Sequence, residues 1–174
     1  MDRTREAGRA DCRVAVTARL SKTRYTQGLR CPRLLWWLVH DPEAEELVPS
    51  PDVAARLAWG RRVGEAARRT FGDGVLIDAG RAASPAALEA TREAIQGGAP
   101  RLYEAAFEHA GVAVAVDVLE RAPAGWRIRE VKSSTGVKPE HVPDVTIQAW
   151  VAHGAGLDLD ALGVTHLDRA CVYP

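Results

Sequence analysis

The sequence predicts one α/β domain with a mixed central sheet and an added N-terminal helical portion. A length of 174 residues suits a single domain that can bury a full core. Apolar residues make up 47% of the chain and charged residues 26%, which is typical of a globular protein rather than a disordered or fibrous one. From residue 84 onward, the predicted order of elements is helix, three strands, helix, strand.

Two helical segments are predicted in the N-terminal part of the chain. Apolar residues near helical spacing predict a helix over 21–41, which Pro32 either kinks or splits in two. A second apolar stripe predicts a helix over 50–72, with Ser50 or Asp52 as its N-cap. These two segments form the predicted helical extension.

A short strand and a well-delimited helix come next. The apolar run 75–78 predicts the strand. The helix is predicted over 84–98, because Pro85 stands at its first helical position and Gly97 can end it.

The second half of the chain contains most of the predicted sheet. Three strands over 101–110, 111–120 and 125–134 are joined by loops short enough for hairpins, which predicts an antiparallel meander. A helix over 138–156 and a final strand over 163–173 complete the chain.

Basic residues are concentrated near the N-terminus, although the net charge is zero. Residues 1–33 carry nine Lys or Arg against three Asp or Glu, and residues 1–19 are predicted to be a basic tail. Such an excess can contact phosphates, but an arginine-rich composition that merely solvates the chain explains the same pattern. The candidate nucleic-acid contacts are Lys22, Arg24, Arg30 and Arg33.

The sequence shows no targeting segment and no complete cysteine site. The longest apolar run, "LLWWLV", is too short to span a membrane, so we expect a cytoplasmic protein. Cys12, Cys31 and Cys171 are widely spaced and include no C-x-x-C pair. Neither a disulfide framework nor a complete zinc site is therefore predicted.

Two carboxylates and a lysine form the main candidate site. The chain has 20 arginines but only three lysines, and one of these, Lys132, follows Glu130 by two residues. Residues two apart in a strand share a face, so both side chains project the same way. In the preceding strand, Asp117 shares its face with alanines. If the two strands pair through the loop "APAG", Asp117 and Glu130 come close enough to share a cation.

The chemistry of this set favours a hard divalent cation. Two close carboxylates repel each other unless a proton or a metal lies between them, and Mg²⁺ accepts one or two carboxylates with waters and phosphate oxygens. Lys132 would add a compact charge that orients or deprotonates a water or neutralises a phosphate. Taken alone, Glu130 and Lys132 can equally be a surface ion pair worth about 0–1 kcal/mol. Mg²⁺ or Mn²⁺ is the expected cofactor.

These residues, on the second and third strands of a helix, three strands, helix, strand order, resemble the PD-(D/E)XK nuclease superfamily. The segments "LSKTRYTQGLRCPRLLW", "YEAAF", "DVLERAPAGWRIREVKSST" and "DVTIQAW" resemble its RecB-type branch, related to CRISPR-associated RecB-like exonucleases and mostly known as uncharacterised prokaryotic proteins. The resemblance covers residues 20–174 and implies a restriction-endonuclease-like core. Because the relatives are longer, it also implies that this domain is incomplete at its C-terminus.

The resemblance implies a role for each matching residue. Asp117 and Glu130 would be metal ligands with the Val131 carbonyl, and Lys132 would be the catalytic lysine. Gln148 would be the glutamine of the helix motif beside the active site. Glu104 stands where an additional acid occurs, although it can also be an ion-pair partner of Arg101 or Arg127.

Three positions depart from the pattern of the RecB-type branch. A metal-binding histidine is expected four residues after a helix glycine, but the residue four positions after Gly60 is Gly64. The tyrosine expected four residues after the motif glutamine is Ala152. Cys31 resembles the first cysteine of an iron-sulfur site, yet the cluster cannot be completed within this chain, and Cys31 can equally be a small buried apolar residue.

The function implied is a Mg²⁺- or Mn²⁺-dependent DNA phosphodiesterase that holds the DNA backbone without reading its sequence. Additional domains or a helicase-type partner are expected alongside it. Association with a membrane is not expected. The alternative is a non-catalytic nucleic-acid-binding or interaction module on the same fold, for which the missing histidine would be the signature.

Overall fold

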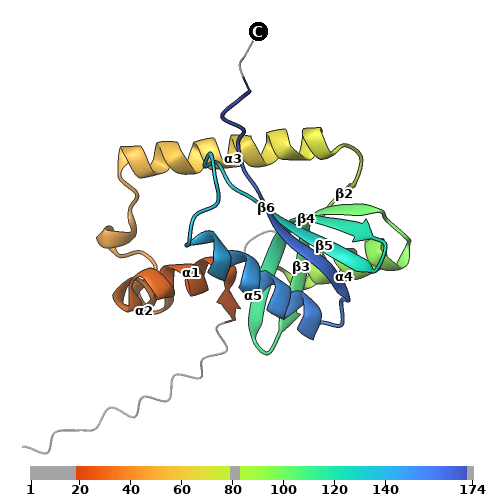
Figure 1. Ribbon diagram of the computed structural model, residues 1–174. Helices are drawn as coiled ribbons and strands as arrows, with labels where there is room; N and C mark the ends of the chain where they lie inside the picture. The colour runs from red at the N-terminus through yellow and green to blue at the C-terminus, as the bar shows by residue number, and fades with distance from the viewer. Residues whose placement is uncertain (1–18, 79–82, 172–174) are drawn as a thin grey trace, which may run out of the picture.

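The computed structural model describes residues 19–78 and 83–171, and it has an α/β fold with a mixed, six-stranded sheet (Figure 1). In chain order, the elements are β1 (Leu20–Ser21), α1 (Lys22–Arg30), α2 (Pro32–His40), a 3-10 turn (Glu45–Leu47), α3 (Pro51–Phe71), β2 (Val75–Leu76), α4 (Pro85–Gln96), β3 (Arg101–His109), β4 (Val112–Ala122), β5 (Gly125–Val131), α5 (His141–Gly154) and β6 (Leu159–Thr165). The α/β class and the mixed sheet predicted from the sequence are confirmed.

The sheet has the strand order β2-β3-β4-β5-β6, and β1 pairs with β4 beside this path. Strands β3, β4 and β5 are antiparallel, which confirms the predicted meander. The pairs β1 with β4, β2 with β3 and β5 with β6 are parallel. The sheet is mixed because two kinds of connection join its strands. A helix or a longer part of the chain connects the two strands of each parallel pair, whereas hairpin loops connect the antiparallel strands of the meander.

The helices begin where local signals predict them. Ser50 and Ser84 accept hydrogen bonds from the backbone N–H groups of Val53 and Ala87, and a proline follows each of these caps. The first predicted helix is split into α1 and α2 at Cys31, because Pro32 has no N–H with which to continue α1. This outcome is one of the two that the sequence allowed.

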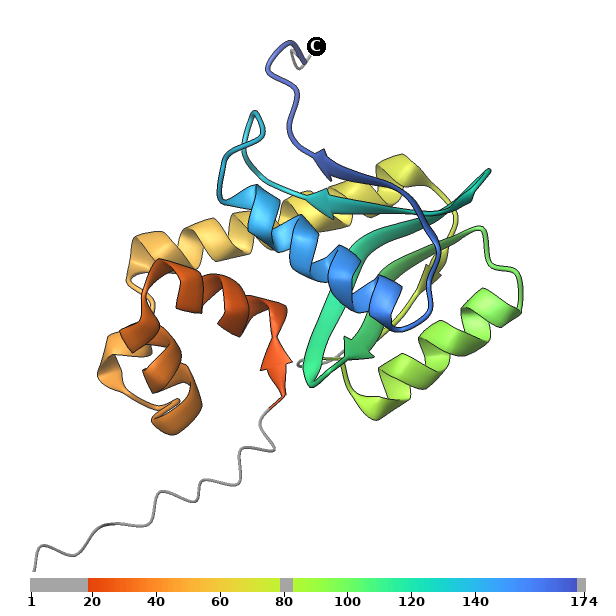
Figure 2. The ribbon, with the colours of Figure 1, turned by 60° about the horizontal axis from the view of Figure 1, so that its bottom comes forward.

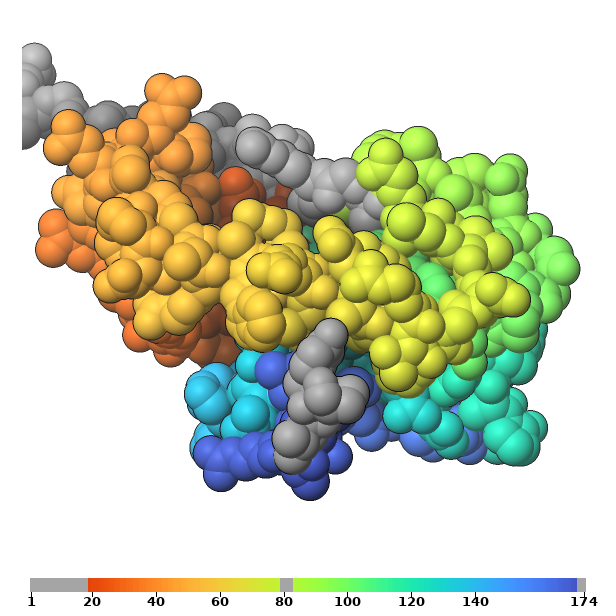
Figure 3. All heavy atoms as spheres, turned by 90° about the horizontal axis from the view of Figure 1, so that it is seen from above, coloured from red at the N-terminus to blue at the C-terminus, as the bar shows by residue number. Residues whose placement is uncertain are grey.

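Helix α5 packs across one side of the sheet, while α3 runs along its upper end. α5 contacts β3, β4, β5 and β6 and also α1, and α4 packs on β3 (Figures 1 and 2). Seen from above, α3 extends from the helical extension at one end of the molecule to the region of α4 at the other (Figure 3). The core between these elements includes Leu102, Ala105, Val116, Leu119, Ile128 and Val151.

Several predicted strand limits were wrong. The last strand spans 159–165 instead of 163–173, because its register pairs Trp126 with Leu159 and Val131 with Thr165, so it ends where β5 ends. The third strand of the meander ends at Val131 instead of residue 134. Strand β2 has two residues rather than four.

The predicted basic tail lies almost entirely outside the described residues, and so does Cys12. Its last residue, Arg19, is described and forms an ion pair with Glu108 of β3. Within residues 19–78 and 83–171, no helix combines the length and the apolar character needed to cross a lipid bilayer.

Candidate functional site

The candidate site lies where strand β4 changes its pairing partner. One edge of β4 is paired with β3 over most of its length. On the other edge, β5 pairs with β4 from Val118 to Ala122, and β1 pairs with it at Val112 and Ala113. Between these two stretches the described residues supply no strand partner, so the sheet opens beside Asp117.

The carboxylate of Asp117 occupies this opening. Its Oδ2 atom accepts a hydrogen bond of 2.7 Å from the backbone N–H of Val131, just beyond the last β4–β5 pair, Val118 with Arg129. A side-chain oxygen thus replaces the carbonyl that a continued ladder would have offered. This contact fixes Asp117 next to the end of β5.

Glu104 of β3 lies opposite Asp117 of β4. It falls between Tyr103 and Ala105, the partners of Val118 and Val116, and it has a left-handed φ of 57°. A glutamate held in this conformation costs on the order of 1–3 kcal/mol, and such residues often occur at functional sites.

The ion-pair partner of Glu104 comes from α3. Arg68 Nη1 lies 3.2 Å from Glu104 Oε1. The partners that the sequence suggested were wrong, because Arg101 and Arg127 pair with Glu120. Burial raises the pKa of Glu104, and the charge of Arg68 opposes that shift.

Glu130 is buried and is contacted by three donors from separate parts of the chain. Lys22 Nζ, at the start of α1, lies 3.1 Å from Oε1 and 3.0 Å from Oε2. Lys132 Nζ lies 2.7 Å from Oε1, and Gln148 Nε2 of α5 donates to Oε2 at 2.6 Å. A carboxylate accepts about four hydrogen bonds, so these donors satisfy Glu130 completely.

Asp144, one turn before Gln148 on α5, contacts both lysines that contact Glu130. Lys132 Nζ also contacts Asp144 Oδ2, and Lys22 Nζ lies 3.4 Å from Asp144 Oδ1. The backbone N–H of Lys132 donates to Thr165 O at 2.8 Å, which holds the residue just after β5 in line with β6. Lys22, Lys132, Glu130 and Asp144 therefore form one partly buried network of ion pairs.

The two site carboxylates have opposite pKa shifts. Burial and the charge of Glu130 raise the pKa of Asp117 to about 7, against the attraction of Lys22. Burial would also raise the pKa of Glu130, but Lys22 and Lys132 outweigh it and lower this pKa to about 2.

Both lysines of the network keep their protons at neutral pH. Burial favours their neutral forms, but the surrounding carboxylates, Glu130 and Asp144 among them, outweigh it and raise the pKa values of Lys22 and Lys132. Lys132 can therefore donate hydrogen bonds and neutralise charge, whereas proton abstraction from a water is disfavoured.

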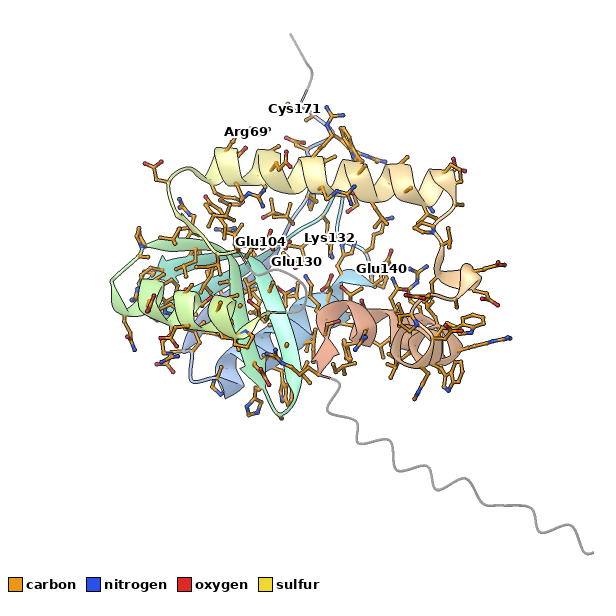
Figure 4. The ribbon with its side chains drawn as sticks, turned by 180° about the vertical axis from the view of Figure 1, so that it is seen from behind. Arg69, Glu104, Glu130, Lys132, Glu140 and Cys171 are labelled. Atoms are coloured by element: carbon orange, nitrogen blue, oxygen red, sulfur yellow. The ribbon has the colours of Figure 1, made fainter. Side chains whose placement is uncertain are left out.

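Glu104, Asp117, Glu130 and Lys132 border a cavity of about 740 Å³ between the sheet and α3. Figure 4 shows Glu104, Glu130 and Lys132 on the sheet side, below α3, and Arg69 and Cys171 on the other side of the helix. Val131, Thr23 and Ser133 also line the cavity. The side of α3 that faces it carries Arg56, Gly60, Arg61, Gly64 and Arg68.

The donor set of the cavity fits a hard divalent cation. Asp117 and Glu130 supply carboxylate oxygens, and Mg²⁺ is commonly held by one or two carboxylates and several waters. The raised pKa of Asp117 reflects burial first and repulsion by Glu130 second, and a bound cation would relieve that repulsion. In the part of the chain that the structure describes, no group of three or more His, Cys, Asp or Glu side chains is arranged to hold a metal ion.

None of the four predicted nucleic-acid contacts lines this cavity, and among them Lys22 contacts Glu130, which does. Arg24 donates to the carbonyl oxygen of Leu38, and Arg30 and Arg33 are exposed on α1 and α2. Cys31 is exposed at the junction of these helices, so its interpretation as a small buried residue was wrong. The sequence predicted the same role for Lys22 and for these three arginines, but in the structure only Lys22 contacts the carboxylates of the site.

Sequence reasoning missed Asp144 and the arginines of α3. Asp144 and Gln148 are four residues apart on a largely apolar helix, and this spacing of two polar residues on one face was a usable signal. Arg56, Arg61 and Arg68 share a helix face with two glycines. That pattern was also present in the sequence, but many surface helices carry arginines.

The network joins α1, the end of β5 and α5, and Glu130 and Lys132 of this network line the cavity on the side of α3. No protein-family model, curated protein or solved structure matches this chain.

Proposed function

We propose that this chain is a divalent-metal-dependent DNA phosphodiesterase with a restriction-endonuclease-like core, of the PD-(D/E)XK type that its motifs resemble. One observation carries the proposal: Asp117, Glu130 and Lys132 line the same cavity at the point where β4 and β5 separate. The order α4, β3, β4, β5, α5, β6 supports this core. An ordinary surface ion pair does not account for a glutamate that is only 3% exposed.

The residues of the site have separable roles in this proposal. Asp117 and Glu130 would hold Mg²⁺ or Mn²⁺, with the Val131 carbonyl as a further oxygen ligand. The bound metal would polarise the scissile phosphate and lower the pKa of the attacking water. Gln148 donates to Glu130 and keeps its carboxylate oriented, so we assign it a positioning role.

Lys132 would neutralise the negative charge that develops on the phosphate and orient the attacking water. Its ammonium is held by Glu130 and Asp144 at the end of β5, and it lines the cavity. A fixed positive charge in a partly buried site stabilises such a transition state better than a mobile one in water.

The opposite wall of the cavity would hold the DNA backbone. Arg56 and Arg61 of α3 face the carboxylates across the cavity and are exposed at its mouth. Arginine pairs with phosphate through two parallel hydrogen bonds. Gly60 and Gly64 lie on the same face of α3 as these arginines, and a Cβ atom at either glycine would meet no heavy atom within 4 Å. This wall therefore leaves room for a phosphodiester strand.

The test is incubation of EDTA-treated protein with end-labelled linear and circular DNA, with Mn²⁺ or with EDTA. We expect Mn²⁺-dependent cleavage by the wild type and none by Lys132→Met. The variant should still bind Mn²⁺ in calorimetry, since the ammonium group that the substitution removes is not a metal ligand. Lys138→Met is the matched control, because Lys138 is exposed and does not line the cavity.

Absence of both Mn²⁺ binding and cleavage in the wild type would contradict the proposal. The non-catalytic nucleic-acid-binding or interaction module on the same fold would then be the better account. That alternative draws on Gly64, which stands where the RecB-type pattern has a metal-binding histidine.

A further inference from the structure

Lys22 occupies a place in the site that the proposed reaction does not use. Its ammonium contacts both oxygens of Glu130, at 3.0 and 3.1 Å, and lies 3.4 Å from Asp144. The side chain is only 20% exposed. A cation thus already lies on the carboxylate that the proposed function assigns to the metal.

The backbone of the N-terminal segment brings Lys22 to this position. Leu20 and Ser21 of β1 pair with Val112 and Ala113 of β4, and the N–H of Leu20 donates to Gly111 O at 2.9 Å (Figure 2). Ser21 then caps α1 by accepting from Arg24 N at 3.2 Å. Lys22, the first residue of α1, is thereby directed at the opening beside β4.

Glu130 cannot accept a further cation while all its present donors remain. Its oxygens are contacted by Lys22, Lys132 and Gln148, which fill the capacity of a carboxylate. Gln148 also donates to the Asp144 carbonyl, and Lys132 also contacts the Asp144 side chain. Lys22 makes the longest contacts with Glu130 of the three, at 3.0 and 3.1 Å, and lies 3.4 Å from Asp144, so it is the donor that can withdraw with least rearrangement.

We propose that Lys22 is an internal counter-cation that competes with the divalent metal for Glu130, so that metal binding requires its ammonium to leave this carboxylate. This inference rests on the proposed function, because it concerns the same metal site. Lys22 sets the metal affinity of the site, and the N-terminal segment β1–α1 is thereby linked to metal occupancy.

The test is calorimetric titration of EDTA-treated protein with Mn²⁺, together with the Mn²⁺-induced change in melting temperature. Lys22→Met removes the ammonium and nearly keeps the shape of the side chain, so it should bind Mn²⁺ about tenfold more tightly than the wild type. Lys22→Arg keeps a cation and should retain the wild-type affinity. Lys138→Met removes the same charge from the exposed surface and should also leave the affinity unchanged.

Removing Lys22 leaves Glu130 and Asp144 with one cation fewer, which can prevent folding in EDTA. Lys22→Gln, which can still donate to Glu130, is the second variant, and Mn²⁺-dependent recovery of its melting transition counts in favour of the inference. Equal or weaker Mn²⁺ binding by both neutral variants overturns the inference and leaves the proposed function intact if the wild type binds metal and cleaves DNA. If neither the wild type nor any variant binds Mn²⁺, the proposed function fails and the inference fails with it.

Discussion

The side chain of Asp117 accepts a hydrogen bond of 2.7 Å from the backbone N–H of Val131, so a carboxylate of β4 takes a ladder position at the end of β5. This contact has a structural and a chemical consequence. It satisfies a backbone donor where the two strands separate, and it fixes the carboxylate beside Glu130. The two consequences can be separated by substitution.

Asp117→Asn should fold like the wild type but lose its response to metal. The amide oxygen of asparagine can still accept from the Val131 N–H, whereas a neutral amide is a poor ligand for Mg²⁺. At a hundredfold excess of Mn²⁺ over Kd, the wild type should gain about 2.7 kcal/mol of stability, and the variant should gain none. Thermal melts with Mn²⁺ and with EDTA measure this difference, and an undiminished Mn²⁺ shift in the variant would rule out Asp117 as a ligand.

The stability of the metal-free protein should fall as the pH rises from about 4 to about 7. The pKa of Asp117 is raised to about 7 by burial and by Glu130, so the folded state binds more protons than the unfolded state in this window. The stability contributed by the proton is complete below the unfolded pKa and is lost as the pH passes the folded pKa. The pKa of Glu130 is lowered to about 2, so Glu130 changes the stability only at pH values below this window.

Urea unfolding in EDTA between pH 5 and 8 checks this pH dependence. The wild type should lose stability on the order of a few kcal/mol across that range, and Asp117→Asn should show a much flatter profile. Parallel profiles for the two proteins would show that another group is responsible.

Much of the fold could be predicted because local signals determine it. Ser50 and Ser84 cap the helices that the sequence assigned to them, and Pro32 divides α1 from α2. Strand β1 was missed because only its pairing with β4 makes Leu20 and Ser21 a strand. The limits of β6 were wrong for the same reason, since its register with β5 decides where it begins and ends.

Only the site residues that lie on or next to the β4–β5 hairpin could be predicted to come together. Strand alternation brings Asp117, Glu130 and Lys132 together, and these residues do line one cavity. The contacts of Lys22 and Asp144 with Glu130 and Lys132 depend on how α1 and α5 pack against the sheet. No periodicity within a single segment contains that information.

Gly64→His should create an additional metal ligand. Gly64 faces the same cavity as Asp117 and Glu130, and a Cβ atom built there meets no heavy atom within 4 Å. The RecB-type pattern has a histidine at this position, so the substitution should tighten Mn²⁺ binding by about tenfold or more. Calorimetry measures the change.

Gly64→Ala is the control for the histidine variant. It changes helix propensity by about 1 kcal/mol without adding a ligand, so its Mn²⁺ affinity should equal that of the wild type. Equal affinities for the histidine and alanine variants would show that position 64 does not reach the metal.

The two sides of α3 should differ in their effect on DNA binding. Arg56 and Arg61 face the cavity of the candidate site, whereas Arg62 and Arg69 line a second cavity, next to Trp59 and Phe71, that adjoins the first at Lys132. Arg62 also lies over the ring of Trp59, 5.5 Å from its centroid. These four residues of one helix therefore provide two test positions and two matched controls.

Arg56→Gln and Arg61→Gln should each weaken the binding of single-stranded or duplex DNA in EDTA, because each would lose one phosphate contact. Fluorescence anisotropy over a range of salt concentrations should show the slope of log Kd against log salt decreasing by about 0.7 to 0.9 per lost contact. Arg62→Gln and Arg69→Gln remove the same charge from the other side of the helix and should leave this slope unchanged. If all four variants weaken binding equally, DNA responds to the overall charge of α3 and the cavity is not its path. If only the cavity-facing pair weakens it, the phosphodiester backbone lies between α3 and the carboxylates of β4 and β5.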